Sequence, residues 1–511
     1  MAIEPKTSPL VILGLDAGVP DLIEHWASEG FLPTLASIMK RGCWGRTVGP
    51  ELICEHAVWV SLFSGVSCAR HGYYYFRQLK PGTYDLQTVS GRDVDAVPFW
   101  AHLRGRDRRA AIIDARETYP LAGLPGLQLA EWATHNPRFA PSAEPAELLQ
   151  EVRRVFGSHM RIDEEFDSTV RRDRQIFRRL LARIGKKGAL CRYLLGRDRY
   201  DLVVVVFGES HTAGHQFWKY RPEANVTGAP RENGELTHAI RNIYHAIDRE
   251  MGLLLAHVPS DANVSIVSST GLEDRYPAAG LIEAFCRQLG YQAPAEPSSV
   301  PLRPLALIRQ TVPEPWRAAL SRRLPREVRE RLLAGQFRSG TNWRKTTAFG
   351  IPSSYTSFVR VNLRGREPEG IVEPGAAYRA LLDRLEADLT QLIDPQTGQR
   401  AVKQVTRVGE LFASSPPVSL PDVFVDWESG SHFMPQVVHP KAKLEQQKPE
   451  FFRESDHSRS GFVAAAGPSI RARGAIGDVS VLDLAPTFLS LMGEPVRETM
   501  TGQVIRAMIH G

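Results

Sequence analysis

The stretch LVVVVFGESHTAGHQFW, residues Leu202–Trp218, joins a run of six apolar residues to a pair of histidines. A short apolar run of this kind is typical of a strand buried inside a parallel sheet. His211 and His215 follow on a segment that enters a helix, and their spacing of four residues puts both imidazoles on one helix face. Ligands of α/β sheets bind beyond the carboxyl ends of the strands. The stretch therefore predicts an α/β fold with a metal held by two histidines, and two ordinary polar histidines are the alternative.

The rest of the chain shows the same alternation of apolar runs and helical periodicity. Further buried strands are predicted at Leu10–Leu15, Arg109–Ile113 and Val264–Ser268. Helices are predicted at Pro20–Gly42, Glu147–Arg183 and Asn233–Leu255. This order is typical of a mostly parallel sheet with helices on both faces. Two late strands, Val423–Trp427 and Gly461–Ala466, are expected to return to the same sheet.

The length of 511 residues exceeds the usual domain of about 100–200 residues, so we expect one large α/β core that carries an insertion. The composition shifts to proline and arginine between Pro294 and Pro352, where no long apolar strand runs. We therefore divide the chain into the first part of the core at 1–293, an insertion or cap at 294–352, and the second part of the core at 353–511.

The amino-acid composition indicates which binding partners and which cellular compartment to expect. The net charge is +6, but the arginines near Arg171–Arg179 are interleaved with acidic residues, so we expect no nucleic-acid partner. Five cysteines without a CxxC pair argue against a disulfide framework and against a cysteine-held zinc. No signal peptide and no apolar run of about 18 residues is apparent. We expect a cytoplasmic protein that does not contact the membrane and that binds an anionic small-molecule substrate.

A third histidine, His457, lies in the segment Asp456–Phe462, directly before the apolar run that ends at Ala466. Together with His211 and His215 it supplies three protein ligands, which leaves one coordination position open, as in catalytic zinc sites. An exposed loop histidine is the alternative. Zinc is the expected metal, and iron and copper are compatible with three imidazoles.

A series of further motifs extends along nearly the whole chain. In order, they are Gly14–Asp16, Trp59–Gly65, Arg70–Gly72, His211–Trp218, the strand that runs to Gly271, Arg360–Pro368, Leu420–Asp422 and His457–Pro468. This series resembles the type I phosphodiesterase and nucleotide pyrophosphatase branch of the alkaline phosphatase superfamily. The resemblance implies an alkaline-phosphatase-like core, and it implies hydrolysis at two zinc ions that flank a threonine or serine nucleophile.

The resemblance also assigns residues to the first metal, which in this family takes an Asp-x-x-x-His motif and a late histidine. These positions fall on His211, His215 and His457, so that an imidazole stands where the family has an aspartate.

The second metal of the family matches less well. Asp16 corresponds to its early aspartate ligand, and Glu55 occupies the position of the nucleophile. Ser269 and Thr270 stand where the family has a consecutive Asp-His, and they supply neither a carboxylate nor an imidazole. We therefore expect the second metal site to be lost, and Asp16 is kept as a candidate ligand.

Roles follow for the neighbouring side chains. Glu55 is predicted to act as a general base or as a fourth ligand, because a carboxylate is a poor phosphoryl acceptor. Cys54 is an alternative nucleophile, although a small core residue is the plainer interpretation. Arg360 and Arg364 are candidates to bind the anionic substrate, with structural ion pairs as the alternative.

Three functions remain open on these grounds. The first is a metal-dependent hydrolase of a phosphate or sulfate ester that uses a mononuclear three-histidine site. The second is the same scaffold recruited for group transfer, elimination or oxidation in a biosynthetic pathway. The third is a metal-free binding pseudoenzyme, against which the three histidines argue.

Overall fold

The computed structural model describes residues 8–137, 139–165, 168–222, 234–296, 326–413, 417–428, 432–449 and 452–510. The chain divides into two compact units. The first comprises Met1–Tyr75, Ser90–Glu273 and Glu454–Gly511, and the second comprises Phe76–Val89 and Asp274–Arg453.

Among the described residues of the first unit, a nine-stranded sheet has the order β19-β2-β18-β9-β1-β8-β5-β6-β7. Strands β9, β1, β8, β5 and β6 run parallel to one another, whereas β18 and β7 run antiparallel to their neighbours. In chain order the strands are β1 Leu10–Leu15, β2 Cys43–Val48, β5 Ala110–Ile113, β6 Gly126–Ala130, β7 Ser142–Glu144, β8 Leu202–Phe207, β9 Asn263–Ser268, β18 Gly461–Ala466 and β19 Gly474–Ser480.

Both faces of this sheet are covered by helices. Successive side chains of a strand point to opposite sides and so enter two different apolar clusters. Val11, Leu13 and Leu15 of β1 pack into one apolar cluster, and Leu10 and Ile12 pack into another. The first cluster is completed by α1 Pro20–Ser28, α2 Pro33–Arg41, α5 Glu147–Phe156, α6 Val170–Leu195, α7 Glu209–Phe217 and α8 Ala239–Leu255. The second is completed by α3 Val58–Ser64 and α15 Leu484–Leu491.

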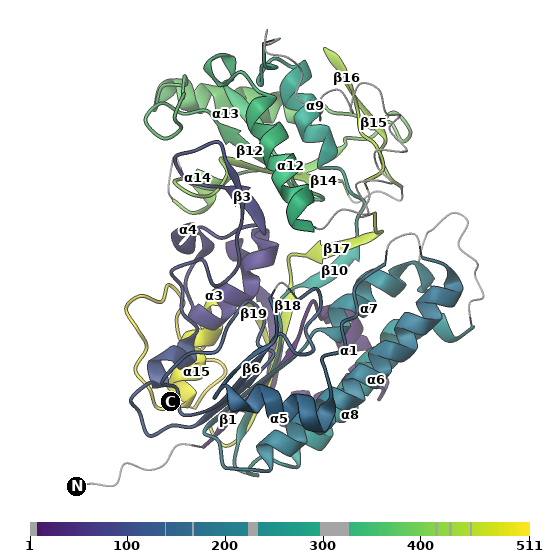
Figure 1. Cartoon of the computed structure of the whole chain (residues 1–511), viewed down its shortest axis with the longest axis vertical. Helices are drawn as coiled ribbons and strands as arrows, with labels where there is room; N and C mark the ends of the chain where they lie inside the picture. The colour runs from purple at the N-terminus through teal and green to yellow at the C-terminus, as the bar shows by residue number, and fades with distance from the viewer. Residues whose placement is uncertain are drawn as a thin grey trace. The chain divides into compact units, whose positions relative to one another are not determined.

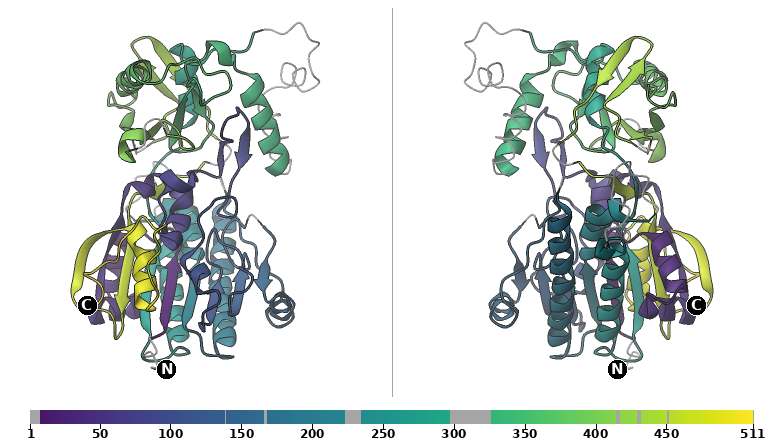
Figure 2. Two further views of the ribbon diagram at one scale, coloured as in Figure 1. Left: turned by 90° about the vertical axis from the view of Figure 1, so that its left-hand side faces the viewer. Right: turned by 90° about the vertical axis from the view of Figure 1, so that its right-hand side faces the viewer.

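The figures show the two helical layers directly. In Figure 1 the sheet separates α3 and α15 from α5, α6 and α8. The right-hand view of Figure 2 looks onto the face covered by α6 and α8, and the left-hand view has α15, in yellow, in front of the sheet. The predicted fold class, a mostly parallel α/β sheet with helices on both faces, is confirmed.

Two predicted helices are each divided in two. The segment Pro20–Gly42 contains α1 and α2, with Gly30 at φ 82° and Pro33 at the start of the second helix. The segment Glu147–Arg183 contains α5, which ends before Gly157, and α6, which begins after the side-chain cap of Thr169. Glycine with positive φ and proline at a first helical turn both interrupt helical periodicity.

The second unit has its own antiparallel sheet, with the order β11-β12-β14-β13, and its own apolar core. Its main elements are α9 Gly280–Gln288, α12 Arg326–Ser339, β11 Ala348–Ile351, β12 Ser357–Val361, α13 Ala376–Thr390, β13 Val402–Arg407 and β14 Val423–Trp427. The expectation that Val423–Trp427 returns to the main sheet is therefore wrong, because it pairs with β12 and β13. Gly461–Ala466 does join the main sheet, as β18, between β2 and β9.

The remaining elements are short. They are α4 Cys68–His71, β3 Arg77–Leu79, β4 Leu86–Thr88, β10 Gly271–Asp274, α14 Val408–Leu411, β15 Gln436–His439, β16 Ala442–Glu445 and β17 Ser455–Ser458. The segment expected as an insertion, residues 294–352, lies within the second unit, and its residues 297–325 are outside the described part of the chain. Its role as an insertion or cap stays a prediction.

All five cysteines are buried free thiols. In the part of the chain that the structure describes, no helix combines the length and the apolar character needed to cross a membrane.

Candidate metal and catalytic site

The register of the central strands brings three polar segments to one edge of the main sheet. Leu15 at the end of β1 pairs with Phe207 of β8 and with Ser268 of β9. Asp16, the first turn of α7 and Ser269 follow directly, so they lie together at the carboxyl ends of parallel strands. This is the edge at which α/β sheets place their ligands.

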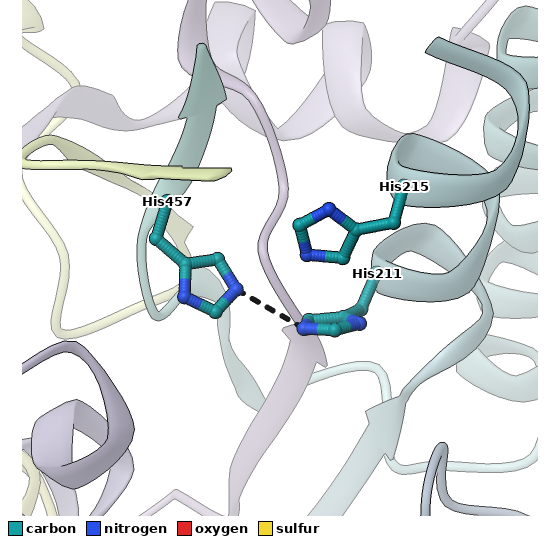
Figure 3. Close-up of side chains that lie close together, drawn as sticks. All are labelled: His211, His215 and His457. Carbon is teal, nitrogen blue, oxygen red and sulfur yellow. Dashed lines mark hydrogen bonds between the residues drawn. The ribbon is translucent and has the colours of Figure 1, made fainter. Parts of the chain in front are cut away.

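The three predicted histidines come together at this edge. His211 and His215 are one turn apart on α7, and His457 comes from β17, which pairs with β10. Figure 3 shows the rings pointing toward one another from the helix and from the strand. One ring nitrogen from each residue lies within 4.8 Å of the others, and the Nε2 atoms of His211 and His457 are 3.0 Å apart. Two imidazoles on one tetrahedral zinc, each at about 2.0–2.1 Å, would have nitrogens about 3.3 Å apart. The donor set therefore fits a single divalent cation.

The outer nitrogens of two rings are bonded to the protein. The Nδ1 atom of His211 lies 3.0 Å from the Oε1 atom of Glu164, and the Nδ1 atom of His215 lies 3.0 Å from the hydroxyl of Ser455. Metal-binding histidines commonly donate their second N–H in this way, which orients the ring and directs the other nitrogen to the metal. Glu164 and Ser455 were not found from the sequence, because neither belongs to a recognisable motif.

Glu55 lies beside His457, and its role as a base or ligand stays a prediction. Its Oε2 atom is 3.8 Å from Nδ1 of His457, and Glu55, Asp456 and His457 form a second group of ligand atoms within 4.8 Å of one another. The side chain of Glu55 is 14% exposed, so water can reach it. A general base needs both this access and closeness to the reacting groups. Asp456 was missed, although it directly precedes His457.

Asp16 is surrounded by donors from the protein. One carboxylate oxygen accepts from the indole N–H of Trp59 at 2.7 Å and from the hydroxyl of Ser269 at 3.3 Å. The other lies 2.7 Å from Nδ1 of His135 and 4.0 Å from Nε of Arg116. Burial acts to raise the pKa of Asp16, but His135 and Arg116 hold that pKa well below its usual range. The carboxylate is therefore charged and compensated by side chains.

His135 links this carboxylate to the histidine cluster. Burial and the nearby Arg116 guanidinium lower the pKa of His135 to about 3, so the ring is neutral. The guanidinium only donates, and its Nη2 atom lies 3.4 Å from Nε2 of His135. Nδ1 therefore carries the proton and faces Asp16. The ring also stacks on His211, with centroids 3.7 Å apart and planes at 14°. His135 was missed because it stands in a loop without a motif.

The candidate role of Asp16 as a metal ligand stays a prediction. Among the described residues, the groups of three or more that can hold a metal include His211, His215, Glu55, Asp456 and His457, but not Asp16.

A glycine in β1 permits the contact between Trp59 and Asp16. A Cβ atom at Gly14 would lie 2.9 Å from the ring of Trp59 and 2.8 Å from Val206, which is closer than carbon atoms pack. The missing side chain therefore lets the indole lie against the strand and reach the carboxylate that follows it.

Two fully buried ion pairs lie next to the segments that carry the site residues. Arg183 of α6 lies 2.7 Å from Glu209, the first residue of α7, and Lys187 lies 2.9 Å from Asp114. Asp114 also accepts the backbone N–H of Ala133, in the loop that leads to His135. Removing one partner of such a pair leaves a buried charge uncompensated. The two pairs thus fix the start of α7 and the course of the loop.

Cys54 is fully buried next to Glu55 in the sequence. Burial and a hydrogen bond with Cys54 raise the pKa of the Cys68 thiol well above its usual value. A buried pair of neighbouring thiols suits packing better than attack on a substrate, and the role of Cys54 as an alternative nucleophile stays a prediction.

The two candidate substrate-binding arginines make contacts within the second unit. Arg360 is buried. Its Nε atom lies 2.7 Å from Oε1 of Glu367, and its Nη1 atom donates a hydrogen bond to the carbonyl of Leu420. Arg364 is exposed and forms an ion pair with Glu373. Both guanidiniums therefore have internal partners, and their role toward a substrate stays a prediction.

Two solved structures are similar to this chain over nearly its whole length. The human ectonucleotide pyrophosphatase / phosphodiesterase 5 structure covers 98% of this chain and 100% of its own, at 10% identity and a TM-score of 0.48. The inactive murine protein of the same name, in complex with AMP, covers 96% of each chain at 12% identity and a TM-score of 0.47. No curated protein matches the chain.

The family assignment rests on the sequence. A model of the family described as type I phosphodiesterase / nucleotide pyrophosphatase matches residues 10–306, which is more than half of the chain. The match includes β1, the Glu55 segment and the first two histidines. The chain therefore belongs to the type I phosphodiesterase / nucleotide pyrophosphatase family of the alkaline phosphatase superfamily.

Proposed function

We propose that this protein is a metal-dependent hydrolase of a phosphate or sulfate ester, similar to a phosphodiesterase, that uses one divalent cation held by His211, His215 and His457. The observation that carries the proposal is the convergence of three ring nitrogens within 4.8 Å. The family supports it, because its name describes hydrolases of phosphodiester and pyrophosphate bonds. Zinc suits three imidazoles with an open position.

The bound cation would supply Lewis acidity, which polarises the ester and makes a water molecule more acidic. Glu55 would take a proton from the attacking water, since its partly exposed carboxylate lies beside His457. The water oxygen forms a bond to phosphorus or sulfur, the bond to the leaving oxygen breaks, and the leaving oxygen takes a proton from solvent. With a carboxylate at the nucleophile position, this route is direct and forms no covalent enzyme intermediate.

A second candidate is the recruited scaffold, in which the same mononuclear site performs group transfer, elimination or oxidation. The observation in its favour is the engagement of Asp16 by Trp59, Ser269 and His135. A carboxylate occupied in this way is a poor ligand for the second metal on which the two-metal reaction relies.

The test is the metal content of the purified protein, measured by elemental mass spectrometry, together with hydrolysis of an aryl phosphodiester and an aryl sulfate. We expect about one zinc per chain in the wild type. We expect His215→Ala to lose both the metal and the hydrolysis, because two imidazoles bind zinc far more weakly than three. His245→Ala is the matched control, since His245 is an exposed histidine on the neighbouring helix α8.

The other outcomes each point to one alternative. One metal without hydrolysis of either ester moves the assignment to the recruited scaffold. Two metals per chain contradict a mononuclear centre, and no metal in freshly purified protein supports the binding pseudoenzyme.

A further inference from the structure

Glu164 places a buried carboxylate directly behind one of the metal-binding rings. Its Oε1 atom is 3.0 Å from Nδ1 of His211, and its side chain is only 3% exposed. It lies in the segment between α5 and α6, 47 residues before the histidine in the sequence. A carboxylate taken out of water at this position costs free energy unless its partners compensate it.

The contact determines which nitrogen of His211 carries the proton. When the carboxylate of Glu164 is ionised it only accepts hydrogen bonds, and Nδ1 of His211 is then the donor. In a neutral ring, Nε2 then holds the lone pair, and this atom is the one that faces His457 at 3.0 Å. With Glu164 as the acceptor, His211 is therefore in the tautomer that can bind a metal through Nε2.

Charge gives the carboxylate a second effect. Three neutral imidazoles contribute no negative charge to a divalent cation, and the side chains of His211 and His457 are only 7% and 10% exposed. Coulomb attraction is stronger in such a poorly hydrated site than in water. A carboxylate on the far side of His211 makes the ring more basic and offsets part of the charge of the cation.

The opposite contact limits how the ring can turn. The ring of His135 stacks on the face of the His211 ring, with centroids 3.7 Å apart. This stacking restricts rotation of the His211 ring out of its plane, and Glu164 contacts the Nδ1 edge of the same ring. Stacking leaves both nitrogens available, whereas the hydrogen bond distinguishes them. The choice of nitrogen therefore depends on Glu164.

We infer that Glu164 is a positioning residue of the metal centre, which fixes the Nε2-binding tautomer of His211 and raises the affinity for zinc. This inference rests on the proposed function, because it requires the three histidines to bind a metal. It extends that function to a residue that touches neither the metal nor the substrate.

The experiment measures the zinc dissociation constant of the full chain by competition with a chromophoric chelator. The proteins are the wild type, Glu164→Ala, Glu164→Gln and the control Glu165→Gln. Glu165 is the next residue, and its carboxylate pairs with Arg172 rather than with a histidine. We expect Glu164→Ala to raise the dissociation constant about 10–100-fold, the usual effect of losing such an outer partner. We expect a smaller rise for Glu164→Gln, whose amide oxygen still accepts from Nδ1, and none for Glu165→Gln.

A second readout separates positioning from a general loss of structure. Nitrogen-15 NMR of the metal-free protein reports the tautomer of His211, and we expect the Nδ1–H form in the wild type and a mixture of both forms in Glu164→Ala. Thermal unfolding with chelator present shows whether each variant folds. If Glu164→Ala folds and binds zinc with the wild-type constant, or keeps the Nδ1–H form, the inference is wrong. If the wild type itself binds no zinc, the proposed function fails instead, so the two failures are distinguishable.

Discussion

Two clusters of polar side chains at the same edge of the main sheet differ in what their atoms face. In the histidine cluster, ring nitrogens of His211, His215 and His457 converge within 4.8 Å. In the other cluster, one oxygen of Asp16 accepts from the indole N–H of Trp59 at 2.7 Å, and the other oxygen lies 2.7 Å from Nδ1 of His135. In the first cluster the ring nitrogens face a common point, and in the second the carboxylate oxygens face groups of the protein.

The neighbours of a side chain therefore influence whether it can act as a ligand. A buried carboxylate has to be compensated by hydrogen bonds or by positive charge. In most metal sites the cation provides that compensation, whereas here His135 and Arg116 supply it to Asp16. The ring nitrogens of the histidine cluster converge on a common point that a cation can occupy, whereas the oxygens of Asp16 already face protein groups.

The largest effect is expected at Glu55, the carboxylate that lies beside His457 in the histidine cluster. We expect Glu55→Gln to lower kcat by about 10²–10⁴-fold, because an amide cannot accept the proton of the attacking water. The zinc content should stay at one per chain, measured by elemental mass spectrometry alongside the kinetics. Unchanged kcat would exclude Glu55 as the base, and loss of zinc would make it a ligand.

An intermediate effect is expected at Asp16. Asp16→Asn should lower the free energy of unfolding by about 1–3 kcal/mol, because the new amide NH2 group would face the N–H of Trp59 or of His135. Chemical denaturation with zinc removed measures this loss. Zinc content should be unaffected, and a variant that loses a metal would show instead that Asp16 is a ligand.

The smallest effect is expected outside both clusters, at Arg364. Its ion pair with Glu373 joins side chains that are 61% and 55% exposed, and such pairs contribute about 0–1 kcal/mol. We expect Arg364→Ala to change the free energy of unfolding by no more than this and to leave KM unchanged. A clear rise in KM without loss of stability would support the predicted role in binding the substrate.

Much of the first unit could be predicted from local patterns. The apolar runs of β1, β8 and β9 predict buried strands because each strand is covered on both faces, and their ends mark the edge where chemistry is found. The spacing of His211 and His215 puts them on one face of a helix whatever the helix packs against. These features depend on residues that are close in the sequence.

Strand pairing is different. Val423–Trp427 and Gly461–Ala466 are both apolar strands, but the first joins the antiparallel sheet of the second unit and the second joins the main sheet. An apolar run specifies a buried strand without specifying its neighbour, because the pattern of side chains does not encode the partner.

The α/β class and the three-histidine hypothesis could both be derived from the amino-acid sequence, since periodicity and motif spacing act over a few residues. The side chains that surround those histidines become visible only in the folded chain. Glu164 meets His211 across 47 residues, Ser455 meets His215 across 240, and His135 comes between Asp16 and His211. A hydrogen bond requires atoms within about 3 Å of each other, and only the folded chain brings groups so far apart in sequence to that distance.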